Sequence, residues 1–506
     1  MLSSLHEIAS IFMGIEFSYE NEASKCKNVL LVGNGFDLAL GQKTKYSDFL
    51  LYLILIYSVY IALDEPDELD IKKINIEDIE NGFESYPDLN FFLEIFKVRI
   101  SKSPLEKEDI GDLLEENKFT NQFLSMLLQE ELSKSKDLTE EVISGHIKSS
   151  DATKLYIERL FTDSNDKTKK TQNKLLKVGL VLDKFKNIYD TNQTSSLSIN
   201  GWLDVERFIE YLVLKESDVL QNKFYPKSNN RVKNCFLSDL IDSDIKNDTS
   251  TANEYFCNLQ KFTDEFCSYL ATHFELTITK GNSNFCNTSG ISHPKSILLQ
   301  NLININLKDK EDLSQAGIKG IDIVHKISSI IDFNYSRTTD LLKDTILGKI
   351  QFNERDKIQG SYLDITHVNG SCKLESKKNT AIFGYSRNEQ KVDSSELNIE
   401  AFKFEKGSQR ILKNVKALDF EKIEQGGFNL IIFGFSCAPA DADVIKPLLT
   451  SPELKIAVVL CHTENEMLSI YKNLTDILGT KTINHLLRKT TKHTQRLFLI
   501  VNSQSP

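Results

Sequence analysis

The pattern of apolar and polar positions divides this chain into two kinds of sequence. Short apolar runs that end abruptly in turn residues fill 25–65 and 320–500, whereas 66–320 mostly repeats apolar residues at spacings of three and four. The first pattern is typical of strands and the second of amphipathic helices. We therefore predict the first βα unit of an α/β domain at 25–65, a helical insertion or subdomain at 66–320, and the remainder of the α/β domain at 321–500.

The later apolar runs predict strands at 328–333, 362–368, 380–383, 429–433 and 454–460. Two of them, 429–433 and 454–460, are almost entirely apolar, as is typical of parallel strands that are buried on both faces. The expected fold class is α/β. It is an open, mostly parallel, Rossmann-like sheet with a large helical insertion between the first and the later strands.

The helical region contains periodic segments that predict helices at 90–100, 109–132, 151–161, 170–189 and 253–274. A separate apolar run, 49–63, stops at Asp64-Glu65-Pro66. It is shorter than the roughly 18–20 residues that a membrane-spanning helix needs. We expect a buried helix there and no membrane span.

The first predicted strand, 29–32, ends in Gly33-Asn34-Gly35 and continues with a helical pattern. Glycines let backbone N–H groups approach a ligand, and a helix N-terminus favours an anion such as a pyrophosphate. The segment is not a full Gly-x-Gly-x-x-Gly fingerprint, and it has no Walker lysine. A tight turn in an ordinary α/β domain therefore remains the alternative.

Five predicted strands end in clusters of glycine or polar residues. The clusters are Gly33-Asn34-Gly35, Asn334-Tyr335-Ser336-Arg337, Asn369-Gly370-Ser371, Gly384-Tyr385-Ser386 and Gly434-Phe435-Ser436. Because ligands of parallel sheets bind at the carboxyl ends of strands, these endings predict a ligand site. The alternative is that these residues are ordinary turn residues between strands and loops.

Composition narrows the function classes. The 506-residue chain has a net charge of −11, which argues against a general nucleic-acid binder. Its eight cysteines include no Cys-x-x-Cys pair, so we expect no zinc and no other metal. The N-terminal residues do not show the basic segment followed by an apolar segment that is typical of a secretory signal, and we expect a cytoplasmic protein. The acids of 64–70 could hold Mg²⁺ in a nuclease, but a solvated acidic loop explains them better.

Several segments together resemble the AbiH abortive-infection family of bacterial antiphage proteins. They run in the family's order along residues 28–480. The segments are Gly33-Asn34-Gly35-Phe36-Asp37-Leu38 with Tyr46-Ser47-Asp48-Phe49, Trp202-Leu203-Asp204-Val205-Glu206, Phe333-Asn334-Tyr335-Ser336-Arg337-Thr338, His367-Val368-Asn369-Gly370-Ser371, and Gly434-Phe435-Ser436 with Asp441. The resemblance implies a role in defence against phage.

The same order is more distantly similar to sirtuin-type NAD-binding folds. By that resemblance Asn334 takes the place of an Asn beside the nicotinamide ribose. Ser336 stands where an Asp is often found, and Asn369 stands where a His is expected. A neutral Asn cannot act as a general base near pH 7, whereas His367 can, and it shares a strand face with Asn369. A histidine that simply completes the core is the alternative for His367.

The expected catalytic residues are accordingly Asn334, His367 and Asn369. Asp37 is a candidate for ribose or substrate contacts, or else a first-turn helix acid favoured by the dipole. Arg337 is a candidate phosphate ligand or a structural ion-pair partner. The residues expected to bind the nucleotide are Gly33, Asn34, Gly35, Asp37, Ser336, Gly370, Gly434, Ser436 and Asp441.

Two functions of different class follow. The first is an abortive-infection effector that binds NAD or a related nucleotide and hydrolyses its glycosidic bond, with NAD as substrate. The alternative is a non-catalytic defence protein whose helical insertion binds a phage or host protein. Asn369 in place of a His and the large charged helical block favour this second reading. A homo-oligomer is compatible with either function.

Overall fold

The computed structural model describes residues 26–39, 42–121, 123–124, 149–162, 173–191, 198–199, 202–203, 205–214, 248–279, 327–336, 338–340, 364–372, 379–386, 399–461, 463–487 and 497–501. The chain divides into two compact units. The α/β unit comprises Met1–Lys43, Phe274–Cys372 and Leu412–Pro506, and the helical unit comprises Thr44–His273 and Lys373–Ile411. This division places residues 44–65 and 373–411 in the helical unit.

The α/β unit contains a six-stranded parallel sheet, which confirms the predicted fold class. Its order is β10-β9-β8-β1-β6-β7, and every neighbouring pair runs parallel. Counted along the chain, this is the 3-2-1-4-5-6 order of dinucleotide-binding folds. The strands are β1 (Lys27–Val32), β6 (Ile327–Asp332), β7 (Asp364–His367), β8 (Phe428–Phe433), β9 (Leu454–Cys461) and β10 (Leu497–Val501).

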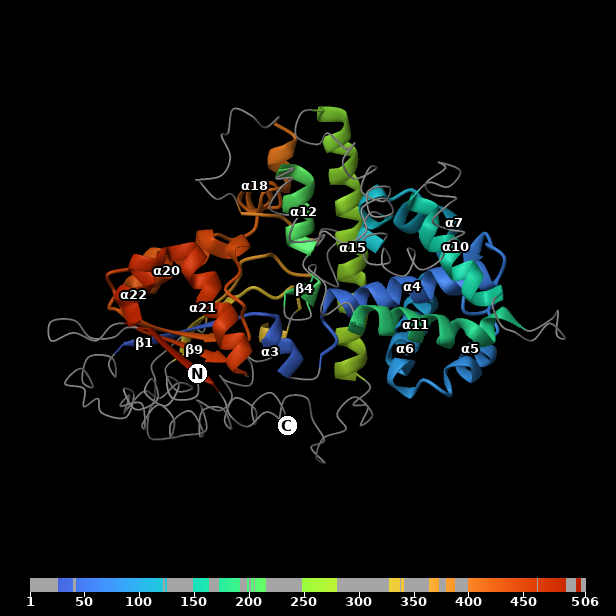
Figure 1. The fold of residues 1–506 in the computed structure, drawn as a ribbon, viewed down its shortest axis with the longest axis horizontal. Coiled ribbons are helices and arrows are strands. Elements are labelled where there is room, and N and C mark those ends of the chain that lie inside the picture. The colour runs from blue at the N-terminus through green and yellow to red at the C-terminus, as the bar shows by residue number, and fades with distance from the viewer. Residues whose placement is uncertain are drawn as a thin grey trace, which may run out of the picture. The chain divides into compact units, whose positions relative to one another are not determined.

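Three helices cover one face of this sheet: α20 (Ala442–Thr450), α21 (Glu464–Leu478) and α22 (Thr480–Leu487). Figure 1 shows them beside the strands. Their apolar residues join alternate residues of the strands, such as Leu31, Leu430 and Val459, in one buried core. The unit also contains the short helices α3 (Asn34–Ala39) and α19 (Phe420–Glu424) and the 3-10 turn Pro439–Asp441.

The register of the sheet aligns the ends of its strands. Val32 of β1 lies opposite Asp332 of β6 on one side and opposite Phe433 of β8 on the other, and Asp332 in turn lies opposite His367 of β7. Residues in one such row project from the same face of a sheet. The last residues of β6 and β7 are therefore brought together as neighbours by strand pairing alone.

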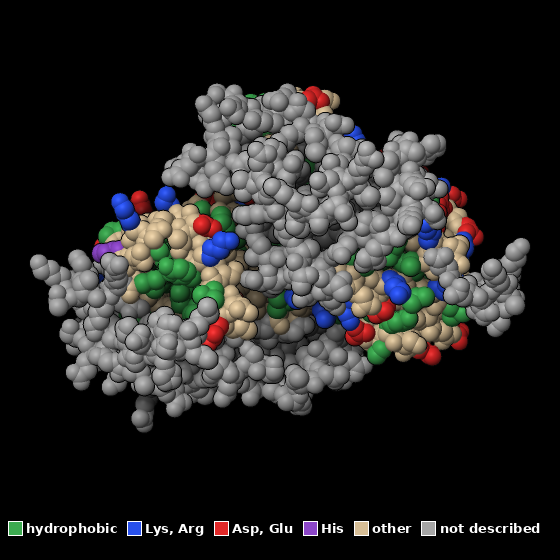
Figure 2. Space-filling model, in the orientation of Figure 1, with side chains coloured by type: hydrophobic (Ala, Val, Ile, Leu, Met, Phe, Trp, Pro, Cys, Tyr) green, Lys and Arg blue, Asp and Glu red, His purple; other side chains and the backbone are tan. Residues whose placement is uncertain are grey.

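The helical unit is built around α4 (Tyr46–Ala62), whose residues from Phe49 to Ile61 are all buried. This confirms the buried helix predicted at 49–63. No helix among the described residues has both the length and the apolar character needed to cross a bilayer. In Figure 2 acidic and basic side chains are interspersed over the described part of the visible face.

The other elements of the helical unit are mostly helices. They are α5 (Ile76–Phe83), α6 (Asn90–Lys102), α7 (Lys107–Ile110), α10 (Ser149–Thr162), α11 (Val178–Thr191), α12 (Val205–Leu214), α15 (Thr249–Thr279) and α18 (Lys406–Leu412), with a π turn at Gly111–Glu115, 3-10 turns at Pro87–Leu89, Lys174–Lys177 and Ala401–Phe404, and the short strand pairs β2 (Glu68–Leu69) with β3 (Leu105–Glu106) and β4 (Ser198–Ile199) with β5 (Trp202–Leu203). Helices therefore occupy the predicted segments 90–100, 151–161 and 253–274 and most of 170–189.

The strand predicted at 380–383 is wrong. The segment is buried but lies in the helical unit, where side chains satisfy its backbone in place of a neighbouring strand. The N–H of Ala381 donates to Asn379 Oδ1 at 2.8 Å, and the carbonyl of Phe383 accepts from Gln409. Gly384-Tyr385-Ser386 is consequently not a strand ending of the sheet, although Tyr385 makes an isolated bridge to Glu405.

Candidate functional site

The glycine turn after β1 packs directly against the glycine turn after β8. The N–H of Gly35 donates to the Gly434 carbonyl at 2.7 Å, and that of Gly33 donates to the Phe433 carbonyl at 3.2 Å. A Cβ on Gly434 would lie 2.2 Å from the nitrogen of Phe36, and Gly434 has a φ of +61°. The protein's own packing thus requires small residues here, and two of the turn's amide groups are already used within the chain.

Asp332, the last residue of β6, is a fully buried carboxylate with several partners. Its Oδ1 accepts the backbone N–H of Asn334 at 2.8 Å, and its Oδ2 accepts the hydroxyl of Thr339. The same Oδ2 lies 3.2 Å from His367 Nδ1. Burial of a charged group is costly unless it is paired and hydrogen-bonded, and Asp332 satisfies both conditions.

His367 lies between two carboxylates. Its Nδ1 faces Asp332, and its Nε2 lies 3.5 Å from Asp340 Oδ1. Burial would lower the pKa of the imidazole, but the interactions with Asp332 and Asp340 outweigh that effect and raise the pKa to about 9. His367 is therefore an imidazolium at neutral pH, so the role of general base that the sequence suggested does not fit this geometry.

Asp37, on α3, is the second buried carboxyl of this edge and is only 1% exposed. Its Oδ2 accepts the hydroxyl of Ser336 at 2.5 Å, and this hydroxyl lies 3.0 Å from that of Thr338. Among the described residues its Oδ1 has no hydrogen-bond partner. Burial raises the pKa of Asp37 to about 7. The Ser336 hydrogen bond opposes this shift, and the charge of Asp332 adds to it.

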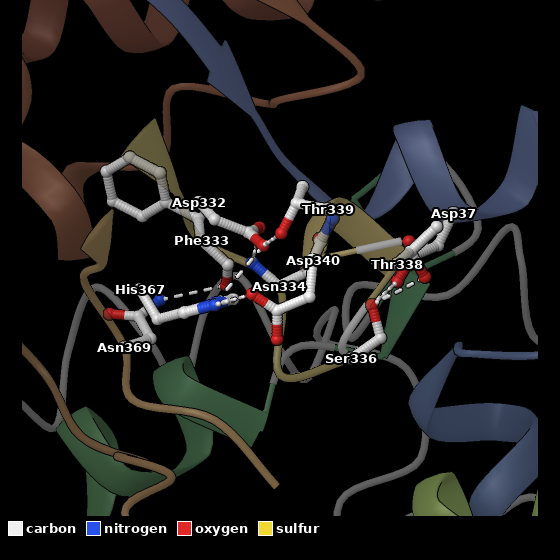
Figure 3. Close-up of polar contacts among 10 residues, drawn as sticks. All are labelled: Asp37, Asp332, Phe333, Asn334, Ser336, Thr338, Thr339, Asp340, His367 and Asn369. Carbon is white, nitrogen blue, oxygen red and sulfur yellow. Dashed lines mark hydrogen bonds and ion pairs between the residues drawn. The ribbon is translucent and has the colours of Figure 1, made fainter. Parts of the chain in front are cut away.

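The loop after β6 joins these two carboxyls. At its start, Asn334 donates its N–H to Asp332, and further along Ser336 donates its hydroxyl to Asp37. Figure 3 shows Asp332 and His367 toward one end of this loop and Asp37 toward the other. The loop therefore holds Asn334, which is 3% exposed, between an ion-paired carboxylate and a carboxyl bonded to hydroxyls.

Asn369 joins the same edge from the turn after β7. Its Nδ2 donates to the Phe333 carbonyl at 3.4 Å, and its buried Oδ1 has no partner among the described residues. Gly370, with a φ of +71°, closes the turn by donating its N–H to the His367 carbonyl at 3.2 Å. The structure thus brings Asp37, Asn334, Ser336, His367 and Asn369 to one end of the sheet.

The remaining predicted residues are placed differently. Ser436 is exposed, and its carbonyl accepts from Asn473 of α21, while Asp441 is buried at the start of α20. Asn34 is half-buried in the first turn of α3. Arg337 lies outside the described residues.

The sequence reasoning missed four residues of the cluster: Asp332, Thr338, Thr339 and Asp340. The available signal was Asp332, which directly follows the apolar pair Ile330-Ile331. A charged residue at the buried end of a strand is costly unless polar partners surround it. Among the described residues, no group of three or more His, Cys, Asp or Glu side chains could hold a metal ion.

A protein-family model supplies the family of the chain. The model described as "Bacteriophage abortive infection AbiH" matches residues 29–462, which is most of the chain. The chain belongs to the AbiH family. The matched range begins in β1 and ends just after β9, so it includes every residue of the strand-end cluster of this AbiH-family member. No curated protein and no solved structure matches the chain.

Membership of the AbiH family points to a role in abortive infection, the defence in which an infected cell is sacrificed or arrested. The family description names no ligand and no reaction.

Proposed function

We propose that this AbiH-family protein defends against phage by binding NAD or a related nucleotide at the carboxyl ends of β1, β6 and β7 and hydrolysing its N-glycosidic bond. The observation that carries the proposal is the buried cluster of carboxyls, amides and one imidazolium at that edge. It lies on a parallel sheet with the 3-2-1-4-5-6 order, and folds of that order bind dinucleotides at the carboxyl ends of their strands.

The charge of the cluster suits a ribose better than a phosphate. Its described side chains are carboxyls, amides and hydroxyls, and His367 is the one cation among them, already engaged by Asp332 and Asp340. Carboxylates and amides accept hydrogen bonds from sugar hydroxyls. They also stabilise the positive charge that develops on a sugar ring when its glycosidic bond breaks.

Hydrolysis would proceed by attack of water on C1′ of the ribose. The new C–O bond forms as the C–N bond breaks, and the electron pair of that bond stays on the nicotinamide nitrogen and cancels its positive charge. One proton of the water passes to an acceptor at the site. Asn334 would orient the ribose hydroxyls or the water, and the His367 imidazolium would pair with Asp332 and hold it in place.

The test is to quantify NAD and adenine nucleotides by mass spectrometry in cells expressing the protein, with and without phage. We expect NAD to fall in infected cells and phage protection to depend on that fall. Asn334→Ala should abolish both effects. A matched variant, Asn484→Ala on α22, changes the same residue type on a covering helix and should behave as wild type.

Unchanged nucleotide pools together with intact protection would contradict the proposal. That outcome would favour the alternative of a non-catalytic defence protein, in which the helical unit contacts a phage or host protein as the trigger or target.

A further inference from the structure

We propose that Asp37 is the group that exchanges a proton with the substrate at the strand-end site, an inference that rests on the function proposed above. The sequence pattern suggests ribose or substrate contacts for Asp37 and the role of general base for His367. The geometry around the two side chains points to the reverse.

Both ring nitrogens of His367 lie beside carboxylates. Nδ1 is buried 3.2 Å from Asp332 Oδ2, within ion-pair distance but without a hydrogen bond, and Nε2 lies 3.5 Å from Asp340 Oδ1. An imidazole in that position keeps its proton, and a nitrogen that faces a carboxylate has no lone pair to offer to a water molecule. His367 is consequently a positioning residue for Asp332.

Asp37 has the opposite arrangement. One oxygen, Oδ2, is fixed by the Ser336 hydroxyl, which sets the orientation of the carboxyl. The other oxygen, Oδ1, is buried and has no hydrogen-bond partner among the described residues. A buried acceptor without a partner is costly, and a substrate or water proton would satisfy it.

The ionisation of Asp37 suits the task. Among the residues that the structure describes, the groups that face Asp37 are the hydroxyls of Ser336 and Thr338 and, at longer range, the carboxylate of Asp332. These described neighbours include no cation, and burial together with Asp332 raises the pKa of Asp37 to about 7. A proton acceptor is most effective when its pKa lies near the working pH.

In the hydrolysis, Asp37 Oδ1 accepts one proton from the attacking water as the oxygen of that water bonds to C1′. The C1′–N bond breaks, its electron pair remains on nicotinamide, and ADP-ribose leaves with the hydroxyl. Asp37 then returns the proton to solvent, so one proton is released per NAD hydrolysed.

The first arm of the test does not depend on turnover. Infrared difference spectra of the full chain between pH 5 and 9 should show the C=O stretch of one protonated carboxyl disappearing near pH 7, and Asp37→Asn should remove that band. Absence of the band in the wild type, or its persistence in the variant, would overturn the inference whether or not the protein hydrolyses NAD.

The second arm measures NAD hydrolysis by the purified protein as a function of pH. We expect activity to rise as Asp37 ionises, with an acid limb near pH 7, and Asp37→Asn to lose about 100- to 10,000-fold. Asp364 lies at the opposite end of β7, and Asp364→Asn is the matched control that should keep wild-type activity.

Full activity in Asp37→Asn would overturn the inference and leave the proposed function standing. No hydrolysis by the wild type would instead overturn both the proposed function and this use of Asp37.

Discussion

Asp37 and Asp332 are two buried carboxyls that compensate for burial in different ways. Asp332 has an ion pair with His367 and hydrogen bonds from Asn334 and Thr339. The described hydrogen bonds to the side chain of Asp37 come from hydroxyls, and its pKa rises to about 7. One end of the sheet therefore holds an imidazolium–carboxylate ion pair beside a carboxyl that changes charge near neutral pH.

At the residue scale, these shifts predict that stability falls as pH rises. The pKa of Asp37 is raised from 3.8 to about 7, so its stabilising effect is complete below 3.8 and lost as pH rises through 7. The pKa of His367 is raised from 6.5 to about 9, so its effect is complete below 6.5 and lost as pH rises through 9.

Urea unfolding at pH 6 and at pH 9.5 measures this dependence. Asp37→Asn should be less sensitive to pH than the wild type, because the amide does not titrate. His367→Gln should cost about 3–5 kcal/mol at pH 6, since it leaves Asp332 buried without its cation, and much less at pH 9.5. Equal pH dependence in all three proteins would show that neither group titrates as described.

At the element scale, the contact between the β1 and β8 turns predicts a sharp difference between two glycines. Gly434→Ala should destabilise the fold by about 2–6 kcal/mol, because the new methyl group meets the backbone of Phe36 and φ is positive. Gly407→Ala, on α18, meets no atom within 4 Å and should be neutral or slightly stabilising. Thermal melts of the two variants decide the point, and similar melting temperatures would argue against the tight turn-to-turn contact.

The sequence predicted those elements whose pattern is local. The strands β8 and β9 and the helix α15 could be predicted from consecutive residues. Burial on both faces gives a strand a continuous apolar run, and burial of one stripe gives a helix apolar residues at regular spacing. The segment 380–383 has the same apolar pattern, but Asn379 accepts the N–H of Ala381 and Gln409 donates to the carbonyl of Phe383. The contact from Gln409 spans 26 residues, so no local pattern encodes it. Strand β10 was not predicted.

The candidate site was predicted in its location and only partly in its chemistry. Strand endings indicated Asn334, Ser336 and Asn369, and the structure places all three at one edge. The ionisation of His367 was not accessible, because its partners Asp332 and Asp340 come from β6 and the segment after it, and only the sheet register places Asp332 beside the histidine.

At the scale of the whole molecule, the helical unit predicts the outcome of a deletion. Removing residues 100–195 deletes α10 and α11, both of which contact α4. The buried residues of α4 would then meet water, so we expect the shortened protein to be insoluble or to lose its cooperative melt by circular dichroism. A soluble, cooperatively folded deletion variant would contradict this.

A partner-binding role of the helical unit is therefore better tested by charge reversal at exposed positions. Glu84→Lys and Glu108→Lys change the surface without uncovering α4. Loss of phage protection in these variants, with unchanged melting and unchanged NAD levels, would favour a protein partner.

The position of β1 in the sheet also sets the order in which the protein can be completed. Asn28 of β1 lies 300 residues before Ser328 and 401 residues before Asn429, yet it contacts both. Among the strands of the sheet β1 is made first, but its second neighbour, β8, follows only when the residues around Asn429, 401 positions later, have been made. Contacts so distant in sequence form slowly. A chain that stops before Phe428 lacks β8 and Gly434, so β1 lacks one neighbour and the turn that leads to Asp37 lacks its packing partner. The packed form of that turn is therefore available only to molecules that extend past Gly434.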